Sequence, residues 1–339
     1  MNDYCCISPD VKLSIVILCW NDLRVIGDCL HSIYCGTRAT SFEVIVSDNG
    51  SNDGSIEFIR KNYPNVRLVE NRANLGFAKG NNVGIRASKG EYVLILNPDT
   101  LIHDGSLDRL VAFADRHWEA DGFGCRVLNS DGSYQVSARL FPTIWRYWVN
   151  AFYLNAFQRL SSVFAYEEYA DWRGNSERVV DWQSGCCVMF RRKLLEKLGG
   201  FDEQFFYHFE EVDLCRRVWN AGSRILFTPG AAITHLGGQS VSRFPIRFEI
   251  EKHRSRYRYF YKHFGSKAAN QCRHLSIARI RVRRIAYGLL VLFKPTQQLR
   301  DRLKMYDAIV RWNKALNPTS FIQNGEEPTL EQDRAVQAS

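Results

Sequence analysis

The sequence lacks any long apolar run. A membrane-spanning helix needs about 18 or more consecutive apolar residues, and the nearest approach, residues 286–293, is much shorter and follows four closely spaced arginines. The first ten residues have neither a basic start nor an apolar core, so we expect no signal peptide. These absences argue against a spanning helix and against a secretory signal.

The ten cysteines lack the spacing of a disulfide framework or of a zinc site. No C-x-x-C pair occurs, two pairs are adjacent in sequence, and Cys19 and Cys125 lie in apolar runs. A reduced thiol in such a run behaves as a small hydrophobic side chain. We therefore expect free thiols, no zinc and a reducing, cytoplasmic location.

Acidic residues are scarce in the C-terminal third. Between Arg243 and Lys314 there are 19 Lys and Arg residues against 4 Asp and Glu residues, a local charge of +15, whereas the whole chain carries +9. This asymmetry favours contact with an anionic partner, such as a membrane surface or a phosphorylated substrate. No nucleic-acid module is recognisable, so we expect no nucleic-acid partner. A solvated basic helix packed on the core is the alternative.

Short apolar runs alternate with amphipathic segments in the first hundred residues. Runs of this length, alternating with helices, indicate parallel strands that are buried on both faces. We expect strands at 13–19, 42–47, 66–69 and 92–96, and helices up to about 35, at 53–62 and at 77–87. The predicted fold class is α/β, a mixed and mainly parallel sheet flanked by helices. Such sheets bind ligands at the carboxyl ends of their strands.

The remainder of the chain is less regular. We expect helices near 104–117, 191–198 and 209–221, and strands within 178–190 and near 224–228 and 231–235. The predicted domains are 1–242, with a nucleotide-binding half (11–100) and an acceptor half (101–242), then a basic, aromatic helical extension at 243–316 and a flexible tail at 317–339. The aromatic segment 139–172 either packs on the core or contacts lipid.

Asp48 follows the second expected strand, in S-D-N-G-S-N-D-G-S. A carboxylate there can accept the imide N–H of a uracil or thymine base, and the alternative is an Asx-turn that only shapes the loop. Trp20 and Asn21 end the first strand at the same edge of the sheet. We predict that these three residues contact the nucleotide and that Asp53 caps a helix.

An amide- and glycine-rich stretch, N-L-G-F-A-K-G-N-N, begins the helix expected at 77–87. Backbone N–H groups at a helix N-terminus suit a diphosphate, and the lysine adds a mobile charge. A capped helix without a ligand is the alternative. The residues predicted to bind the nucleotide here are Asn74, Gly76, Phe77, Lys79 and Asn81.

Asp99 follows the fourth strand, in L-N-P-D-T. A hard divalent cation takes oxygen ligands and completes its shell with water and substrate phosphates, so we predict that Asp99 binds Mn²⁺ or Mg²⁺. Asn97 would supply a weaker oxygen or a sugar contact, and His235 at the end of a late strand would complete the metal site. A type I turn and a structural histidine are the alternatives.

Three acids, Glu210, Glu211 and Asp213, follow the aromatic run Q-F-F-Y-H-F. A carboxylate held beside apolar rings has its pKa raised towards the range in which it can take a proton. Residues adjacent in sequence do not share a helix face, so one glutamate is expected to be the base, and Asp213 is expected to pair with Arg216 or Arg217. A solvated acidic helix start is the alternative.

These motifs, together with D-W-Q-S-G-C-C-V-M-F-R-R and T-H-L-G-G, resemble those of the family-two glycosyltransferases of the GT-A fold, notably the rhamnosyltransferase-like branch. The likeness runs from about Leu13 to His263. It implies that Asp48 reads the pyrimidine, that Asp99 is the remaining acid of the D-x-D motif, and that Glu211 is the catalytic base. Further residues implied at the metal, sugar or acceptor contacts are His235, Asn97, Trp182, Ser184, Gly185 and Glu210.

Two positions depart from the family pattern. Asn97 stands where a full D-x-D motif has its first acid, which would weaken metal binding, and Glu211 is one methylene longer than the Asp of many relatives. The resemblance implies an inverting transfer, in cell-surface polysaccharide synthesis, from dTDP-L-rhamnose to a glycan or polyprenyl-diphosphate-linked acceptor. It places the enzyme peripherally on the cytoplasmic face of an anionic membrane, and an oligomer is compatible with the sequence.

Three other functions are open at this stage. The first is a glycosyltransferase that uses another donor, a UDP- or GDP-sugar. The second is a nucleotidyltransferase of similar fold, for which we expect a glycine-rich segment with Arg and Lys after the first strand, where this chain has W-N-D at 20–22. The third is a non-catalytic protein that binds anionic surfaces through the +15 segment.

Overall fold

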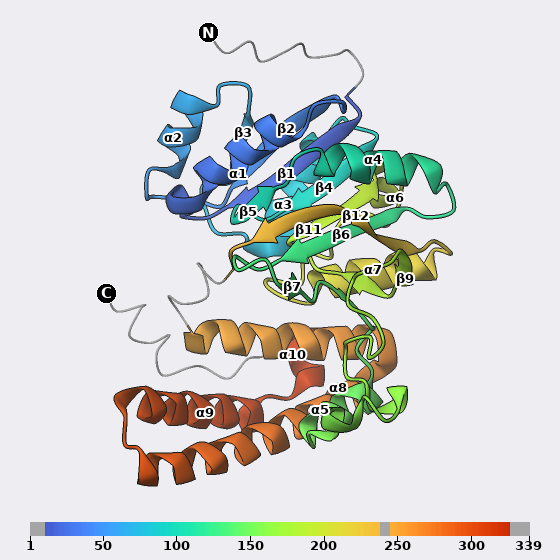
Figure 1. The fold of residues 1–339 in the computed structure, drawn as a ribbon. Helices are drawn as coiled ribbons and strands as arrows, with labels where there is room; N and C mark the ends of the chain where they lie inside the picture. Colours follow the sequence, from blue (N-terminus) through green and yellow to red (C-terminus); the bar gives the residue numbers. More distant parts are fainter. Residues whose placement is uncertain (1–10, 238–244, 326–339) are drawn as a thin grey trace. The chain divides into compact units, whose positions relative to one another are not determined.

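The computed structural model describes residues 11–237 and 245–325 of the chain (Figure 1). Cys5, Cys6, Gly238 of the T-H-L-G-G motif and residues 326–339 of the expected tail lie outside the described residues. The described residues form two compact units. The first falls within Met1–Phe141 and Asp171–Gln239, and the second falls within Pro142–Ala170 and Ser240–Ser339.

A mixed sheet forms the centre of the first unit (Figure 1). The strands along its main path are, in spatial order, β3 (Arg67–Glu70), β2 (Phe42–Asp48), β1 (Leu13–Cys19), β4 (Tyr92–Leu96), β11 (Cys187–Arg191), β6 (Gly122–Leu128), β12 (Ile225–His235) and β5 (Thr100–Ile102). β7 (Tyr134–Gln135) pairs with β6, β9 (Arg178–Val180) pairs with β12, and β8 (Ala138–Arg139) and β10 (Trp182–Gln183) form a separate pair. β1 to β4 are parallel, as predicted, and β11 runs antiparallel to β4.

Helices cover both faces of this sheet. They are α1 (Leu23–Gly36), α2 (Ser55–Asn62), α3 (Gly76–Ala87), α4 (Ser106–Arg116), α6 (Arg192–Leu198) and α7 (Glu210–Asn220). Alternate residues of a strand point to opposite faces, so Ile15 and Ile17 join a core cluster with residues of α1 and α4, whereas Val16 faces α3. A Cβ added to Gly84 of α3 would lie 2.3 Å from Val16 Cγ1. The missing side chain therefore lets α3 approach β1 closely.

The structure confirms the strands and helices predicted for the first hundred residues, but the sequence analysis missed β6 inside the sheet. Gly122 and Gly124 interrupt the apolar pattern by which a strand is recognised in the sequence. A side chain at Gly124 would collide with its neighbour, because an added Cβ would lie 2.5 Å from Gln183 Oε1. The two late strands expected near 224–228 and 231–235 form one strand, β12, whose register shifts between Thr228 and Ala232. The division into nucleotide-binding and acceptor halves stays a prediction.

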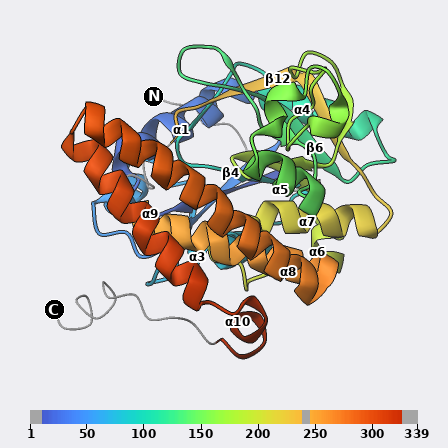
Figure 2. The same ribbon diagram turned by 90° about the horizontal axis from the view of Figure 1, so that it is seen from below.

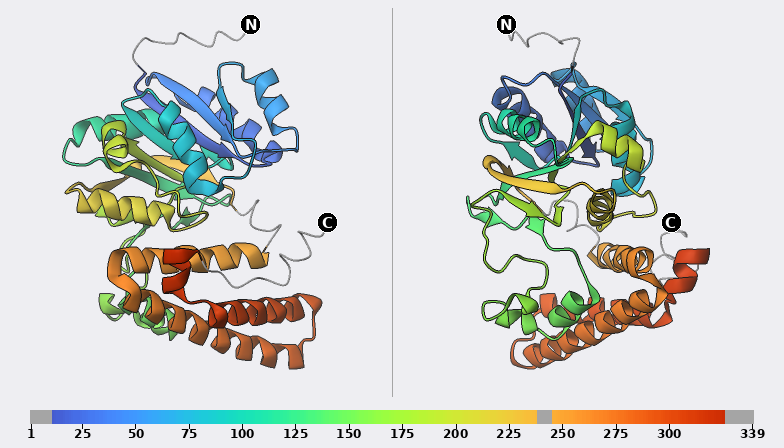
Figure 3. Two further views of the ribbon diagram at one scale, coloured as in Figure 1. Left: turned by 180° about the vertical axis from the view of Figure 1, so that it is seen from behind. Right: turned by 90° about the vertical axis from the view of Figure 1, so that its right-hand side faces the viewer.

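The second unit is helical. Its elements are α5 (Ile144–Ala151), the short 3₁₀ helices η1 (Leu154–Phe157) and η2 (Ser162–Phe164), α8 (Pro245–Phe293), α9 (Gln297–Ala315) and α10 (Pro318–Asn324). Gly265, with φ of 85° and ψ of 176°, interrupts α8. The part of α8 after Gly265 and α9 lie side by side (Figure 2), and α5 packs against α8 (Figure 3).

Two segments of this unit differ from the expectations. Within 139–172, Tyr147 and Val149 are buried while Trp145 and Trp148 are exposed, so the segment packs partly on this unit, and its contact with lipid stays a prediction. The first residues of the expected flexible tail form α10, because Asn317 caps the helix and Pro318 stands in its first turn. Within 11–237 and 245–325, no helix combines the length and apolar character needed to cross a bilayer.

Candidate functional site

Hydrogen bonds join the loops that follow β1 and β2. The Asn21 N–H donates to Ser51 Oγ at 2.8 Å, and the Asn52 N–H donates to Asn21 Oδ1 at 2.8 Å. The Trp20 N–H donates to Asp22 Oδ2 at 2.8 Å. These bonds fix the two loops against each other at the carboxyl edge of the sheet, where the nucleotide is predicted to bind.

The carboxylate of Asp48 shapes its own loop. It is 3% exposed and accepts the N–H groups of Gly50 and Ser51 at 2.9 and 3.0 Å. This is the Asx-turn that the sequence left as the alternative. A carboxylate offers about four acceptor positions, so the turn leaves capacity for the imide of a base. Recognition of the base by Asp48 stays a prediction.

Asp53 holds the starts of two helices together, although Gly54, and not Asp53, occupies the N-cap position of α2. It accepts the Ser55 N–H at 3.1 Å and the Leu23 N–H at 3.0 Å. Burial favours a raised pKa for Asp53, but the hydrogen bonds from Ser55 and Leu23 outweigh it, so its pKa lies below the ordinary value. The carboxylate therefore remains charged and keeps α1 and α2 aligned.

The N-terminus of α3 is bonded to other parts of the chain. The Gly76 N–H donates to Asn74 Oδ1 at 3.0 Å, and the Phe77 N–H donates to the Phe206 carbonyl at 2.7 Å. Gly76 has φ of +80°, and a Cβ there would lie 2.6 Å from that carbonyl. Both N–H groups, which were predicted to bind a diphosphate, are thus already used, and the one of Phe77 holds the aromatic run before α7.

The other two residues predicted at this helix differ in exposure. Lys79 is exposed, whereas Asn81 is fully buried and its Nδ2 donates to the Phe77 carbonyl at 2.9 Å. Only Lys79 has the freedom to reach a phosphate. The nucleotide-binding role of both residues stays a prediction.

The residues predicted for the metal lie together. β5 pairs with the end of β12 and places Thr100 opposite His235. As a result, His235 Nε2 lies 3.2 Å from Asp99 Oδ1 and 3.3 Å from Asn97 Nδ2. The side chains of Asp99 and His235 are 12% and 17% exposed. Residues distant in sequence therefore form one small, partly buried polar group.

Gln135 orients the His235 ring. His235 Nδ1 lies 2.8 Å from Gln135 Oε1, and a carbonyl oxygen only accepts, so Nδ1 carries a proton. In the neutral ring the lone pair of Nε2 then faces the Asp99 carboxylate. Because His235 Nε2 and Asp99 Oδ1 are both electron-rich, their closeness favours a cation beside them. In metal-binding histidines the ring nitrogen that does not bind the metal usually donates a hydrogen bond, as Nδ1 does here to Gln135. Gln135 could not be found from the sequence, because it lies on a strand of only two residues, β7.

The turn between β10 and β11 links this group to α7. A Cβ added to Gly185 would lie 3.2 Å from Phe77 Cζ and 3.7 Å from Glu211 Cβ. The next residue, Cys186, accepts the Asn97 N–H at 3.0 Å. Burial raises the pKa of the Cys186 thiol to about 12, and the negative charges of Asp99 and Glu211 add to the rise. Gly185 and Cys186 therefore connect the segment of Asp99 to the start of α7.

Trp182 and Ser184, predicted to line the acceptor pocket, bond to the segment around β8. The Trp182 indole donates to the Leu140 carbonyl at 3.0 Å, and the Ser184 N–H donates to the Ser137 carbonyl at 2.8 Å. These bonds support the turn that carries Gly185. A direct contact of either residue with an acceptor stays a prediction.

The backbone before α7 adopts an unusual conformation. His208 and Phe209 have φ of 65° and 68°, a region that costs a residue other than glycine about 1–3 kcal/mol. This bend presents Glu210 and Glu211 at the start of the helix. Asp213 is fully buried and pairs with Arg217 at 2.8 Å, which confirms one of the two predicted partners.

The two glutamates at the start of α7 differ in how deeply they are buried. Glu210 is 3% exposed, and its Oε2 has no hydrogen-bond partner within the described part of the chain. Burial, followed by the negative charge of Glu211, raises the pKa of Glu210 well above its ordinary value. Glu211 is half-buried. Glu210 therefore tends to keep its proton, and Glu211 is the less buried of the two acids, although its Oε2 atom is itself buried.

Replacing Glu210 by Gln is expected to remove a pH dependence of stability. Because the folded-state pKa lies above the ordinary value of 4.5, the stabilisation is complete below that value and is lost as pH rises through the folded-state pKa. The unfolding midpoint of the wild type should therefore decrease as pH rises above the ordinary pKa of a glutamate, and that of E210Q should decrease less. The exposed Glu57→Gln is the matched control. Parallel profiles for wild type and E210Q would refute the assignment.

Three comparisons with known proteins identify the family and the fold of this chain. Residues 9–256 match the model of a family described as glycosyltransferase like family 2. The chain is 34% identical over 226 residues to the N-acetylglucosaminyl-diphospho-decaprenol L-rhamnosyltransferase of Mycobacterium tuberculosis (strain CDC 1551 / Oshkosh), which covers 63% of this chain and 73% of that protein. It is 24% identical over 202 residues to rhamnosyltransferase WbbL of Escherichia coli (strain K12), and this match covers 57% of this chain and 72% of WbbL.

A solved structure has a similar fold. The mannosyltransferase PcManGT from Pyrobaculum calidifontis, in complex with GDP-Man and Mn²⁺, aligns with a TM-score of 0.54 over 95% of this chain and 90% of that chain. The two sequences are 18% identical, so the likeness supports the GT-A fold and no finer conclusion.

Proposed function

The chain belongs to the family 2 glycosyltransferases, and we propose that it moves L-rhamnose from dTDP-L-rhamnose to a saccharide on a polyprenyl diphosphate, with inversion at the anomeric carbon. The donor sugar and the acceptor are suggested by the relative from M. tuberculosis, an N-acetylglucosaminyl-diphospho-decaprenol L-rhamnosyltransferase. Such a reaction belongs to cell-surface polysaccharide synthesis.

The observation that carries the proposal is the group at the carboxyl edge of the sheet. Asp99 Oδ1 lies 3.2 Å from His235 Nε2, and the turn at Gly185 connects this group to Glu211. An acid–imidazole pair near a second carboxylate would provide the two functions that the reaction needs. One is to hold a nucleoside diphosphate, and the other is to accept a proton from the attacking hydroxyl.

A divalent cation fits the donor set of Asp99 and His235. A carboxylate oxygen and an imidazole nitrogen suit Mn²⁺, and Mg²⁺ would rely mainly on Asp99. Within the described residues no group of three or more His, Cys, Asp or Glu side chains is arranged to hold a metal, so substrate phosphates and water would complete the shell. When bound, the cation would offset the negative charge of the leaving diphosphate.

Glu211 acts as the general base in this proposal. Its carboxylate takes the proton of the acceptor hydroxyl while that oxygen forms a bond to the anomeric carbon. The bond from that carbon to the diphosphate oxygen breaks, and the nucleoside diphosphate leaves with the electron pair. Glu210 is too buried to meet an acceptor, and its raised pKa keeps it neutral beside Glu211.

We place the reaction on the cytoplasmic face of a membrane. The support is the +15 charge between Arg243 and Lys314, because the cytoplasmic leaflet is anionic and attracts basic segments by about 1 kcal/mol per charge. The exposed Trp145 and Trp148 add amphipathic rings of the kind found at membrane interfaces.

A panel of nucleotide sugars tests the proposed function. The protein, with Mn²⁺ or Mg²⁺, is incubated with dTDP-rhamnose, UDP-glucose, UDP-N-acetylglucosamine and GDP-mannose, each with a prenyl-diphosphate-linked N-acetylglucosamine acceptor. Mass spectrometry is expected to show an added deoxyhexose with dTDP-rhamnose and little product with the other donors. A preference for a UDP- or GDP-sugar would contradict the assigned donor, and no product from any donor would contradict the transfer.

A further inference from the structure

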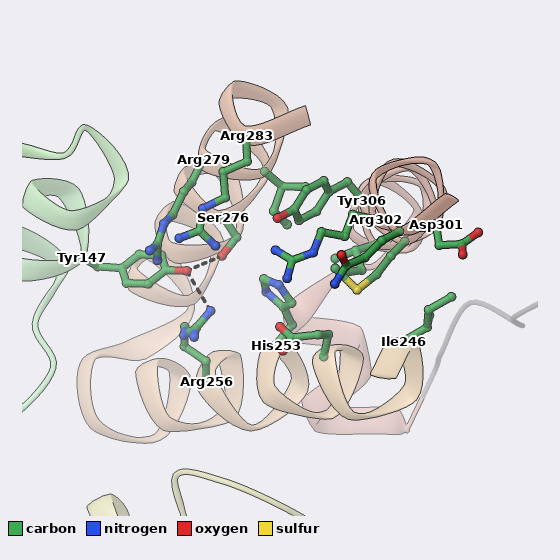
Figure 4. Close-up of a pocket in the computed structure, with 15 residues that line it drawn as sticks. Tyr147, Ile246, His253, Arg256, Ser276, Arg279, Arg283, Asp301, Arg302 and Tyr306 are labelled. Carbon is green, nitrogen blue, oxygen red and sulfur yellow. Dashed lines mark hydrogen bonds between the residues drawn. The ribbon is translucent and has the colours of Figure 1, made fainter. Parts of the chain in front are cut away.

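A cavity of about 590 Å³ lies within the second unit, between α5, the two parts of α8 and α9 (Figure 4). Four arginines line it: Arg256, Arg279, Arg283 and Arg302. They come from both parts of α8 and from α9, so residues distant in sequence are brought around one space. All of its lining belongs to this unit, and none of it belongs to the site described above.

The cavity carries an excess of positive charge. Four arginines and two carboxylates, Glu249 and Asp301, line it, which leaves two positive charges while His253 is neutral. Glu249 is already paired with Lys252 at 2.8 Å, and Asp301 accepts from Gln297 Nε2 at 2.9 Å and points away from the other labelled side chains in Figure 4. Within the described residues, neither carboxylate forms an ion pair with one of these four arginines.

The arginines bond to neutral hydroxyl groups. Arg302 Nη1 donates to the Tyr287 hydroxyl at 2.8 Å, and Arg283 Nε donates to the Tyr153 hydroxyl at 3.3 Å. Arg279 Nε is buried without a hydrogen-bond partner in the described part of the chain. Within 11–237 and 245–325, no ion pair joins any of these three guanidinium groups to a carboxylate. Their charges are available to an anion.

A chain of hydrogen bonds holds the fourth arginine in place. Arg256 Nη1 donates to the Tyr147 hydroxyl at 2.8 Å, and the Tyr147 hydroxyl lies 2.9 Å from Ser276 Oγ. Ser276 in turn donates to the Cys272 carbonyl at 2.9 Å, so Tyr147 is the donor to Ser276. His253 is affected by the same charges: burial, then the positive charges of Arg256, Lys252 and Arg279, hold its pKa well below the ordinary value.

Apolar side chains accompany the arginines. Ile246, Ile280, Met305 and Ile309 also line the cavity. The end of α8 exposes Leu292 and Phe293, at 77% and 87%, and Tyr153, which binds Arg283, is 44% exposed. The chemistry of this unit therefore suits a ligand with an anionic group and a hydrocarbon part.

We propose that this cavity binds the phosphate group of an amphiphile, a phosphate or diphosphate carried on a hydrocarbon chain. The planar guanidinium group matches the geometry of phosphate oxygens and forms charge-assisted hydrogen bonds with them. Two sources offer this chemistry, an anionic phospholipid of the bilayer and the diphosphate of a lipid-linked intermediate. The inference rests on the second unit alone and holds whether or not the proposed transfer is correct.

Vesicle flotation with matched variants tests the cavity. The cavity variant is R279Q/R302Q, and its control is R281Q/R300Q, which removes the same charge from the same two helices at exposed positions. On phosphatidylcholine vesicles containing phosphatidylglycerol or a prenyl diphosphate, the cavity variant is expected to bind about tenfold or more weakly than the control. Equal weakening of the two variants would overturn the proposal, because diffuse surface charge would then explain the binding.

Soluble competitors distinguish the two sources. Farnesyl diphosphate is expected to displace wild-type protein from vesicles at a concentration at which inorganic pyrophosphate does not. Binding to vesicles with phosphatidylglycerol alone assigns the site to a bilayer lipid, and binding only when a prenyl diphosphate is present assigns it to a lipid-linked diphosphate. Equal displacement by pyrophosphate would show that the hydrocarbon chain is not recognised and would overturn the proposal.

A measurement on the wild type covers the case in which R279Q/R302Q does not fold, which circular dichroism would reveal. Hydrogen exchange of peptides from 246–256 and 297–309 is followed with and without farnesyl diphosphate. Slower exchange in both segments is the expected result. Unchanged exchange in both segments at a saturating concentration would overturn the proposal.

Discussion

Replacing Glu211 by Gln is expected to lower the rate of sugar transfer by about 10²–10⁴-fold, the usual loss when a positioned general base is removed. Gln has nearly the same shape as Glu but cannot take a proton from the acceptor hydroxyl. Donor binding, measured by calorimetric titration with dTDP and Mn²⁺, should stay close to that of the wild type. The loss should therefore appear in kcat and not in the affinity for the nucleotide.

Two further variants make this result specific. Glu203→Gln alters another acid before α7 that pairs with Arg86, and it should leave kcat within about twofold, as is usual for exposed ion pairs. Glu211→Asp keeps a carboxylate and should retain more activity than Glu211→Gln. Near-normal turnover in Glu211→Gln would show that another group takes the proton.

Replacing Asp99 by Asn is expected to abolish most activity and to raise the Mn²⁺ concentration needed for half-maximal rate. Removing an outer partner of a metal ligand costs about 10–100-fold in metal affinity, and a direct ligand should cost at least as much. Gln135→Leu, which removes only the bond to His235 Nδ1, is therefore expected to have the smaller effect. Initial rates over a Mn²⁺ titration, after treatment with a chelator, measure both.

The same titration separates a metal site from a structural pair. If Asp99 and His235 serve only to bind each other, Asp99→Asn would lower the unfolding midpoint equally with and without Mn²⁺. The metal hypothesis predicts that Mn²⁺ with dTDP raises the midpoint of the wild type, since a ligand of the folded state stabilises it, but raises that of Asp99→Asn much less. Full activity of the wild type without any divalent ion would contradict the metal site.

Local patterns in the sequence were sufficient for the first half of the fold. The apolar runs that became β1, β2 and β4 are buried along most or all of their length, so their composition shows the strands directly. The polar residues after them were correctly placed at one edge, because the carboxyl ends of parallel strands lie together. The pairing of Asp213 with Arg217 was also visible, since an i, i+4 spacing places both on one helix face.

Other features depend on contacts between distant segments and leave no local pattern. β6 was missed because it contains two glycines, which are required by close packing against Ile225 and Gln183 and not by any local pattern. Gln135 looks like any surface glutamine until the sheet brings it 2.8 Å from His235. The start of α3 looked like a free anion site, but the Phe206 carbonyl binds the Phe77 N–H there.

We propose that Asp48, Asp99 and Glu211 surround a single donor site at the carboxyl edge of the sheet. The most direct test is an experimental structure of the protein with dTDP and Mn²⁺. The account predicts the thymine against Asp48, the diphosphate and the ion at Asp99 and His235, and Glu211 open to the space where a sugar would lie. A nucleotide bound elsewhere, or Glu211 turned away from it into bulk water, would contradict the claim.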